Sequence, residues 1–285
     1  MTTLRQLTVQ SLTHLMEEGT LSIPIDEEAR AILRNWMLAA RHTHPHAATP
    51  PQPPIPAVQQ ETPPAPQTNS TAPAPNSVEE KLAYLQMRAQ NWKPARALGS
   101  LRDTMVFATG NAHAQLMLVG EAPGYDEERL QEPFVGRAGQ KLNQILAAAN
   151  LRREDVYISN ICKFRPDMGP NQGMGNRPPS DEEIAACLPI ILAEIRAIQP
   201  SCIICLGGTA AKGLLGSGAS VASLRGKWFD CQGVPVRVTY HPSYLLRNDT
   251  LTAKRAVWED FLAVLEQMKH NITPRQRRFF LPASS

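Results

Sequence analysis

The chain has 285 residues, of which 42% are hydrophobic and 19% charged, an ordinary composition for one or two folded domains. The net charge of +3 is too small to indicate a polyanionic partner by itself, and there is no apolar run of the ~18 residues that a membrane-spanning helix requires. Five cysteines do not suggest a disulfide framework, and the first residues lack a secretory-signal pattern. These features favour a cytoplasmic protein without a membrane partner.

Two segments are predicted to precede the main domain. Apolar residues recur near helical spacing over residues 1–43, which predicts a small helical segment. It is expected either to pack as an appendage or to bind an unknown protein. Residues 44–77 contain eleven prolines and one acidic residue, Glu61. Such a stretch cannot bury enough apolar surface to fold, so we expect a Pro-rich disordered linker.

Strands and helices are predicted to alternate over residues 78–270. Helices are expected over 78–90, 138–149, 180–198, 209–215 and 251–268, and strands over 115–119, 156–161, 202–206 and 234–240, with an irregular segment at 91–113. This order predicts an α/β domain with a parallel sheet between two layers of helices. Residues 271–285, with three arginines and no acid, are expected to be a basic tail that is solvated or contacts nucleic acid.

The loop after the first predicted strand has an unusual composition. Between Gly120 and Gly139 it contains four glycines, two prolines and five carboxylates. Loops at the carboxyl ends of parallel strands commonly bind ligands. Carboxylates would repel phosphate, so this loop suits a reaction in which positive charge develops.

Complementary polar groups follow the predicted strands. The strands end at Glu121, Asn160, Gly207-Gly208 and His241, so these groups should meet at one edge of the sheet. Asn160 can pair with the edge of a nucleobase, and Phe134 can stack on the base. His241 can donate to an oxygen that gains negative charge, and Glu121 can stabilise a cationic sugar or position water. Together these roles describe cleavage of an N-glycosidic bond.

The segment after His241 suggests contact with DNA. Pro242 stiffens it, Ser243 follows, and Leu245 or Leu246 can wedge into a duplex while Arg247 holds a phosphate; we expect all five residues to contact DNA.

These motifs resemble the uracil-DNA glycosylase superfamily over roughly residues 95–268, and most closely its bacterial and archaeal family 4. The resemblance is carried by Gly120-Glu-Ala-Pro-Gly124 with Glu127-Glu128, Pro133-Phe-Val-Gly-Arg-Ala-Gly139, Asn160, Asn176-Arg177-Pro178, Leu206-Gly207, Leu224-Arg225-Gly226 and His241-Pro-Ser-Tyr-Leu-Leu-Arg247. It implies a four-stranded parallel sheet and a base flipped out of DNA into the pocket.

The resemblance also implies roles for individual residues. Phe134, Asn160, Gly120 and Ala122 would form the base site, and His241 would stabilise the departing base. Glu121 or Glu127 would orient water or stabilise the sugar cation, and both carboxylates remain candidates. The protein is expected to act on DNA as a monomer.

The chain departs from family 4 in two places within the domain. That family typically holds an iron–sulfur cluster with four cysteines, but residues 77–114 contain none, Phe164 occupies the position after the second strand, and only Cys187 matches a ligand. Cys202 and Cys205 point to opposite faces of a strand and are expected to pack in the core. We therefore expect neither a cluster nor another metal. The second departure is a longer segment at 167–175, which can rim the pocket.

Three functions are compatible with this pattern. The first is a DNA glycosylase that removes uracil in base excision repair and leaves an abasic site. The second applies the same chemistry to a modified base, such as a modified cytosine of phage DNA, in antiviral defence; Asn160 does not exclude it because its amide can present either edge. The third is a non-catalytic DNA-binding protein, which the intact Glu121 and His241 argue against.

Overall fold

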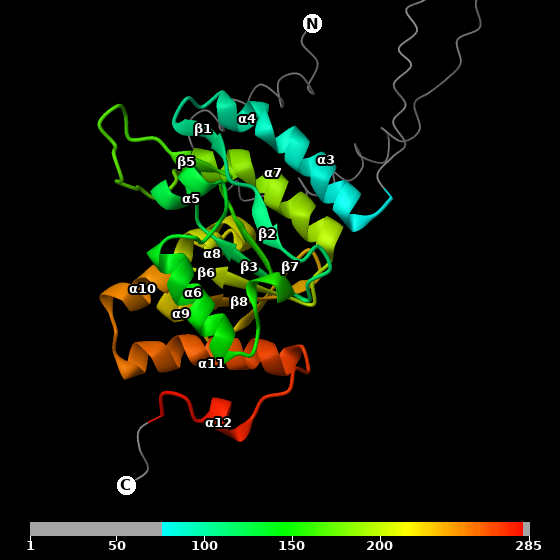
Figure 1. The fold of residues 1–285 in the computed structure, drawn as a ribbon, viewed down its shortest axis with the longest axis vertical. Coiled ribbons are helices and arrows are strands. Elements are labelled where there is room, and N and C mark those ends of the chain that lie inside the picture. The colour runs from blue at the N-terminus through cyan, green and yellow to red at the C-terminus, as the bar shows by residue number, and fades with distance from the viewer. Residues whose placement is uncertain (1–75, 282–285) are drawn as a thin grey trace, which may run out of the picture. The chain divides into compact units, whose positions relative to one another are not determined.

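A computed structural model describes residues 76–281 of the chain. The predicted helical segment at 1–43 and the predicted linker as far as residue 75 lie outside the described residues, as do residues 282–285. The described residues form an α/β domain in which helices cover both faces of a central sheet (Figure 1). No helix in this part of the chain is long and apolar enough to span a membrane.

The central sheet has six strands in the order β2-β4-β3-β6-β8-β7. Four parallel strands form its middle, and an antiparallel strand lies at each edge. In chain order the strands are β2 (Ala108–Gly110), β3 (Leu116–Gly120), β4 (Tyr157–Asn160), β6 (Cys202–Leu206), β7 (Trp228–Cys231) and β8 (Val234–Thr239). The predicted four-stranded parallel sheet is confirmed. The two edge strands, at three and four residues, are too short to show a period in the sequence.

The parallel strands are apolar on both faces because helices cover both. All five residues of β3 are buried, as are all five of β6. Cys202 packs with the core on one face of the sheet and Cys205 with the core on the other, as the spacing predicts. Neither cysteine therefore shares a site with the other.

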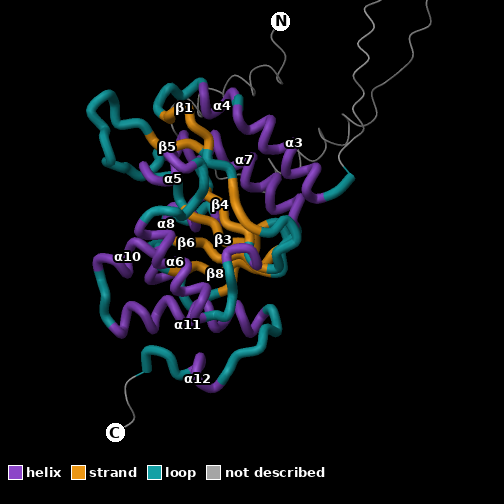
Figure 2. The backbone as a smooth tube through the Cα atoms, viewed as in Figure 1, coloured by secondary structure: helices purple, strands orange, loops and turns teal. Residues whose placement is uncertain are grey.

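The helices form the two outer layers of the predicted three-layer arrangement (Figure 2). Residues of α3 (Val78–Gln90), α7 (Asp181–Ile198) and α8 (Gly208–Leu215) pack on one face of the sheet. Residues of α6 (Arg137–Ala148) and α11 (Leu251–Gln267) pack on the other. The start of α7 follows the predicted capping box, since the Ser180 side chain accepts from the backbone N–H of Glu183 and the Glu183 side chain accepts from that of Ser180.

The segment expected to be irregular is instead structured. It contains α4 (Lys93–Arg96), β1 (Leu101–Met105) and the edge strand β2. Strand β1 pairs with β5 (Phe164–Pro166) in a separate two-stranded sheet. These elements are short and depend on pairing with distant residues, so local pattern does not reveal them.

Short helices complete the domain: α5 (Tyr125–Leu130), the 3₁₀ turn η1 (Arg153–Asp155), α9 (Val221–Leu224), α10 (Pro242–Arg247) and α12 (Pro274–Arg277). Helix α12 lies in the predicted basic tail, and the described part of this tail packs on α11. The indole N–H of Trp258 donates to the Gln276 carbonyl at 2.7 Å, and Arg255 donates to the carbonyls of Arg277 and Phe279, both at 2.9 Å.

Candidate active site

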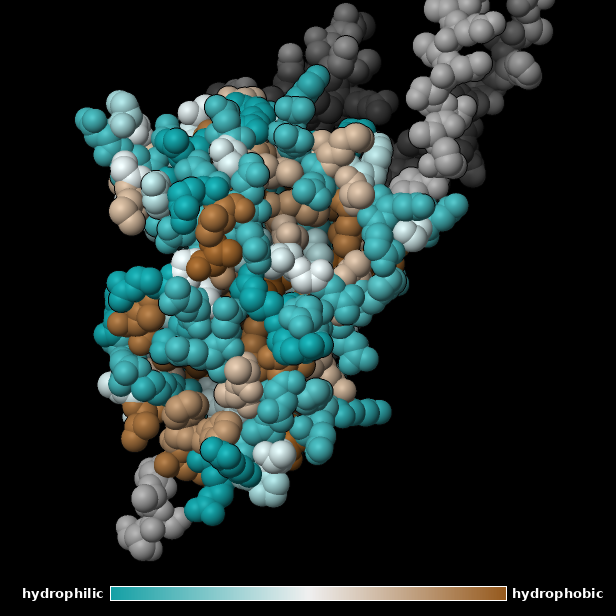
Figure 3. Space-filling model, viewed as in Figure 1, coloured by the Kyte–Doolittle hydropathy of each residue, from teal (hydrophilic) through white to brown (hydrophobic). Residues whose placement is uncertain are grey.

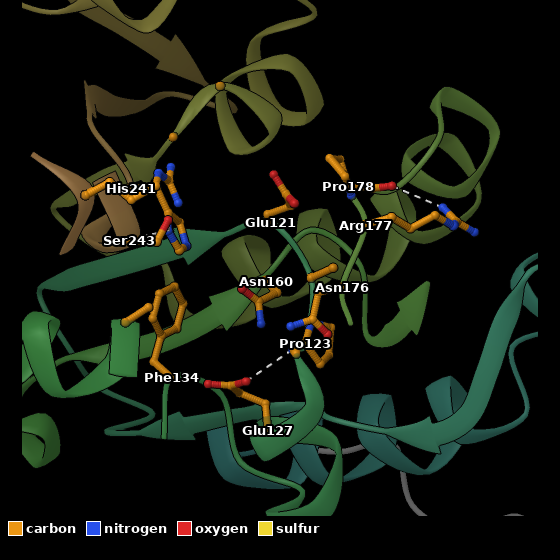
Figure 4. Close-up of a pocket in the computed structure, with 16 residues that line it drawn as sticks. Glu121, Pro123, Glu127, Phe134, Asn160, Asn176, Arg177, Pro178, His241 and Ser243 are labelled. Carbon is orange, nitrogen blue, oxygen red and sulfur yellow. Dashed lines mark hydrogen bonds between the residues drawn. The ribbon is translucent and has the colours of Figure 1, made fainter. Parts of the chain in front are cut away.

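A cavity of about 510 Å³ opens at the carboxyl edge of the parallel strands. Segments that follow β3, β4, β6 and β8 contribute to it, as the sequence predicts. Its walls are formed by Glu121, Ala122, Pro123, Gly124, Glu127, Phe134, Ala138, Asn160, Asn176, Arg177, Pro178, Gly207, Gly208, His241, Ser243 and Arg247. Figure 4 shows Glu121, Phe134, Asn160 and His241 around one space.

Glu121 follows the last residue of β3 and is held from α8. The hydroxyl of Thr209 donates a 2.5 Å hydrogen bond to Oε2 of Glu121. Among the described residues, Oε1 of Glu121 has no hydrogen-bond donor, so it remains available to a ligand in the cavity. The contact of Thr209 with Glu121 was not predicted. The sequence indicated only that Thr209 lies just beyond the carboxyl end of the third predicted strand, where the site was expected.

Glu127 uses both carboxylate oxygens to connect two turns of the acidic loop. Oε2 accepts from the backbone N–H of Gly124 at 3.2 Å. Oε1 accepts from the N–H groups of Val135 and Gly136, at 3.2 and 2.9 Å. The carboxylate therefore ties the start of α5 to the residue that caps α6, and it fixes the segment that follows Phe134.

Phe134 is held in an unusual backbone conformation. Its φ is +57°, and a β-carbon at Gly139 would lie 1.7 Å from its carbonyl oxygen, so only glycine allows this close approach. Arg153 donates to the carbonyls of Phe134 and Pro133, at 3.0 and 2.8 Å. The buried ring of Phe134 therefore forms a fixed wall, with its centroid 5.6 Å from that of the His241 ring.

Asn160 lies at the end of β4, in register with Gly120 of β3. The asparagine is 2% exposed. A β-carbon at Gly120 would lie 2.3 Å from Oδ1 of Asn160 and 2.5 Å from the Phe134 ring. Gly120 therefore leaves room for the side chains of Asn160 and Phe134, and Ala122 lines the cavity itself.

The hydrogen bonds made by His241 place the proton of its neutral ring on Nε2. Nδ1 accepts from the backbone N–H of Ser243 at 3.2 Å and lies 2.8 Å from the Ser243 hydroxyl. Burial, helped by the positive charge of Arg247, lowers the pKa of His241 to about 4. Gly207, with φ of +99°, allows His241 to approach, because a β-carbon there would lie 3.1 Å from that of the histidine. His241 thus presents a neutral N–H donor.

The α10 segment divides into buried and exposed residues. Leu245 is 3% exposed and packs in the core with Pro242 also buried. Leu246 is 36% exposed, and Arg247 lines the cavity. Of the two leucines predicted to contact DNA, Leu245 therefore belongs to the core, because consecutive helical residues point in directions about 100° apart.

Two groups on the cavity wall had no predicted role. Asn176 and Arg177 belong to the motif that precedes α7, and both line the cavity. The Arg165 guanidinium donates to Oδ1 of Asn176 at 2.9 Å and to Glu128 at 2.9 Å. Arg177 forms an ion pair with Glu183 at 2.7 Å. Arg165 and the motif residue Arg177 were visible in the sequence, but their partners Glu128 and Glu183 lie on other elements.

The cysteines do not form a ligand set. All five are free and buried, and in the described part of the chain no three His, Cys, Asp or Glu residues are placed to hold a metal. The position after β4 at which family 4 is expected to carry a cluster-ligating cysteine is filled here by the buried ring of Phe164. The Arg96 guanidinium stacks 4.3 Å from the centroid of this ring. Cys187 has Cys162 beside it, and a hydrogen bond to Cys187 together with burial raises the pKa of Cys162. Two thiols next to a phenyl ring do not fit a group that needs four thiolates.

Comparison with known proteins agrees with this geometry. Residues 107–262 match the model of the uracil DNA glycosylase superfamily. A type-4 uracil-DNA glycosylase of Thermotoga maritima is 44% identical over 161 residues, which are 56% of this chain and 80% of the relative. Those of Archaeoglobus fulgidus and Pyrobaculum aerophilum are 39% and 40% identical over 162 residues, covering 54% of this chain and 78% and 79% of the relatives. The chain therefore belongs to the uracil DNA glycosylase superfamily.

Proposed function

We propose that this protein removes uracil from DNA by hydrolysing the bond between the base and deoxyribose, as a step of base excision repair. The observation that carries the proposal is the convergence of an aromatic wall, an amide, a neutral imidazole and a carboxylate on one cavity. The relatives named type-4 uracil-DNA glycosylases support uracil as the substrate.

Binding of the base is assigned to Phe134 and Asn160. The Phe134 ring stacks on the base without selecting it. The Asn160 amide offers one acceptor and two donors, which match the N–H and carbonyl on the edge of uracil. Because Asn160 is almost fully buried, a base that left its amide unpaired would bind poorly.

Bond cleavage is assigned to Glu121 and His241. As the bond between C1′ and the base nitrogen breaks, its electron pair leaves with the base, and the Nε2–H of His241 donates to the base oxygen that gains negative charge. Oε1 of Glu121 faces the sugar, which becomes cationic, and orients the water whose oxygen bonds to C1′. The water proton passes to the Glu121 carboxylate.

Glu127 is proposed to position the loop rather than the water. Its two oxygens accept three backbone hydrogen bonds, whereas Glu121 accepts one through a single oxygen and is oriented by Thr209. A carboxylate whose two oxygens already accept backbone hydrogen bonds has little capacity left to bind and orient a water.

DNA engagement is assigned to the α10 segment. Arg247 would bind a phosphate next to the extruded nucleotide, and the exposed Leu246 would fill the space that the base leaves. Pro242 and Ser243 shape this segment, the latter through its hydrogen bonds to His241.

We also propose that the protein holds no iron–sulfur cluster. The support is the chemistry of the residues where the family holds its cluster. Phe164 stacks with Arg96 at one ligand position, and Cys162 and Cys187 lie in an apolar core. Purified protein should contain no stoichiometric iron or sulfide, and its absorption spectrum should lack a visible band. One cluster per chain would contradict this proposal.

The function is tested with oligonucleotides that carry uracil, hypoxanthine or a modified cytosine. Each is incubated with the full chain and treated with alkali, which breaks the strand at an abasic site. Breaks at uracil are expected, and they should be lost with His241→Ala. Breaks only at a modified cytosine, or binding without breaks, would contradict the proposal.

A further inference from the structure

The loop at 167–175 is built around buried polar side chains. Arg165, which is 1% exposed, donates to the carbonyls of Gly173 and Gly175, at 3.0 and 2.5 Å. Gln172, which is 8% exposed, donates to the carbonyl of Gly175 at 3.1 Å and accepts from the N–H of Met168 at 3.1 Å. These contacts hold the loop in one conformation.

Apolar side chains project from this held loop. Met168 is 52% exposed and Met174 is 70% exposed. After Asp167 the loop carries no charged residue. A single exposed methionine is ordinary on a protein surface. Here two methionines project from one short uncharged segment in which Gln172 is turned inward and Asn171 is the one exposed polar side chain, so the tip is mainly apolar.

The loop lies beside the mouth of the cavity. It leads directly into Asn176, which lines the cavity, and Arg165 binds both the loop and Asn176. On the other side of the mouth lies α10, with Leu246 exposed and Arg247 on the cavity wall. Figure 3 shows a notch between the loop that follows β5 and α10, at the left edge of the view.

We propose that loop 167–175 is a second DNA-contacting prong, which packs Met168 and Met174 against the bases beside the extruded nucleotide. This inference rests on the proposed function, because it assumes a flipped base in the cavity. Methionine is an apolar wedge that adapts its shape, and such wedges occupy kinked base steps. The absence of charge after Asp167 argues against a phosphate contact. The loop therefore acts on stacked DNA, while α10 supplies the phosphate contact.

The double variant Met168→Ala/Met174→Ala tests the prong. Both side chains are more than half exposed, so the variant should fold. Its kcat/KM for uracil in a duplex is expected to fall about tenfold, but for uracil in a single strand by less than about twofold, because a single strand has no stack to hold open. Met87→Ala, on the exposed face of α3, is the matched control and should change neither value.

Binding to a duplex with a tetrahydrofuran abasic site separates this proposal from the proposed function. If the wild type cleaves no uracil but the double variant binds this duplex about tenfold more weakly than wild type, the cleavage proposal fails and the prong stands. If the double variant bound the abasic-site duplex as tightly as the wild type, the proposed DNA contact of loop 167–175 would be overturned. An equal fall in cleavage of duplex and single-stranded uracil would also overturn it, since the methionines would then act through the cavity.

Discussion

The Thr209 hydroxyl donates a 2.5 Å hydrogen bond to Oε2 of Glu121 and thereby joins α8 to the loop that follows β3. The contact spans 88 positions of the chain. Among the described residues it leaves Oε1 of Glu121 without a hydrogen-bond donor, so the orientation of the proposed catalytic carboxylate depends on a residue outside the acidic loop.

Thr209→Val should therefore slow cleavage. Valine keeps the shape of threonine but removes the donor, so Glu121 loses its orientation and kcat should fall roughly tenfold to a hundredfold, with KM within about twofold of wild type. Single-turnover assays with excess enzyme measure the chemical step. Thr104→Val on β1, outside the cavity, is the matched control. An unchanged rate would show that Thr209 does not orient Glu121.

Two variants should distinguish the role of Glu121 from that of Glu127. Glu121→Gln is expected to slow cleavage about 10²-fold or more with little change in stability. Glu127→Gln puts an amide where two sets of backbone N–H groups need acceptors, so its free energy of unfolding should fall by about 1–3 kcal/mol. Urea denaturation and single-turnover rates measure both effects. If instead Glu127→Gln slowed cleavage and Glu121→Gln lowered the free energy of unfolding, Glu127 would be the residue that orients the water.

His241 should titrate well below its ordinary range. Its pKa of about 4 predicts that the Nε2–H donor persists as the pH falls, so ionisation of His241 should leave the cleavage rate unchanged between about pH 5 and 8. Nitrogen-15 NMR of labelled histidine should show the Nε2–H form over this range. A protonated ring at pH 6 would contradict the assignment.

The same shift predicts a pH dependence of stability. The unfolded chain binds a proton at His241 as the pH falls through about 6.5, whereas the folded chain does so only near 4. The contribution of His241 to stability is therefore lost as the pH falls across this window and is complete above it. Urea denaturation should show that the free energy of unfolding falls less between about pH 6.5 and 4 in His241→Gln than in the wild type.

Asn160→Asp should change selection of the base. A carboxylate provides no donor for the carbonyl of uracil and places negative charge beside it, so cleavage of uracil should fall roughly 10²-fold or more. Rates on uracil and cytosine substrates measure the selectivity, and Asn91→Asp on the C-cap of α3 is the control. If Asn160→Asp still cleaved uracil at the wild-type rate, Asn160 would not be a base-binding residue.

The sequence alone was sufficient for the long elements and for the polar groups at the ends of the parallel strands. Helix α3 and strand β6 have the predicted bounds, because buried strands and amphipathic helices leave local periodic patterns. Glu121, Asn160 and His241 meet as expected, since parallel strands present their carboxyl ends at one edge.

Only the tertiary structure decided what these groups are bonded to. Thr209 on Glu121, the backbone donors on Glu127 and the burial of Leu245 and Phe164 depend on contacts between residues distant in the chain or on the direction of a side chain. Local pattern carries neither kind of information, because a hydrogen bond across the fold leaves no period in the sequence. The sequence thus determined which chemical groups reach the site, and the fold determined which of them are free to act.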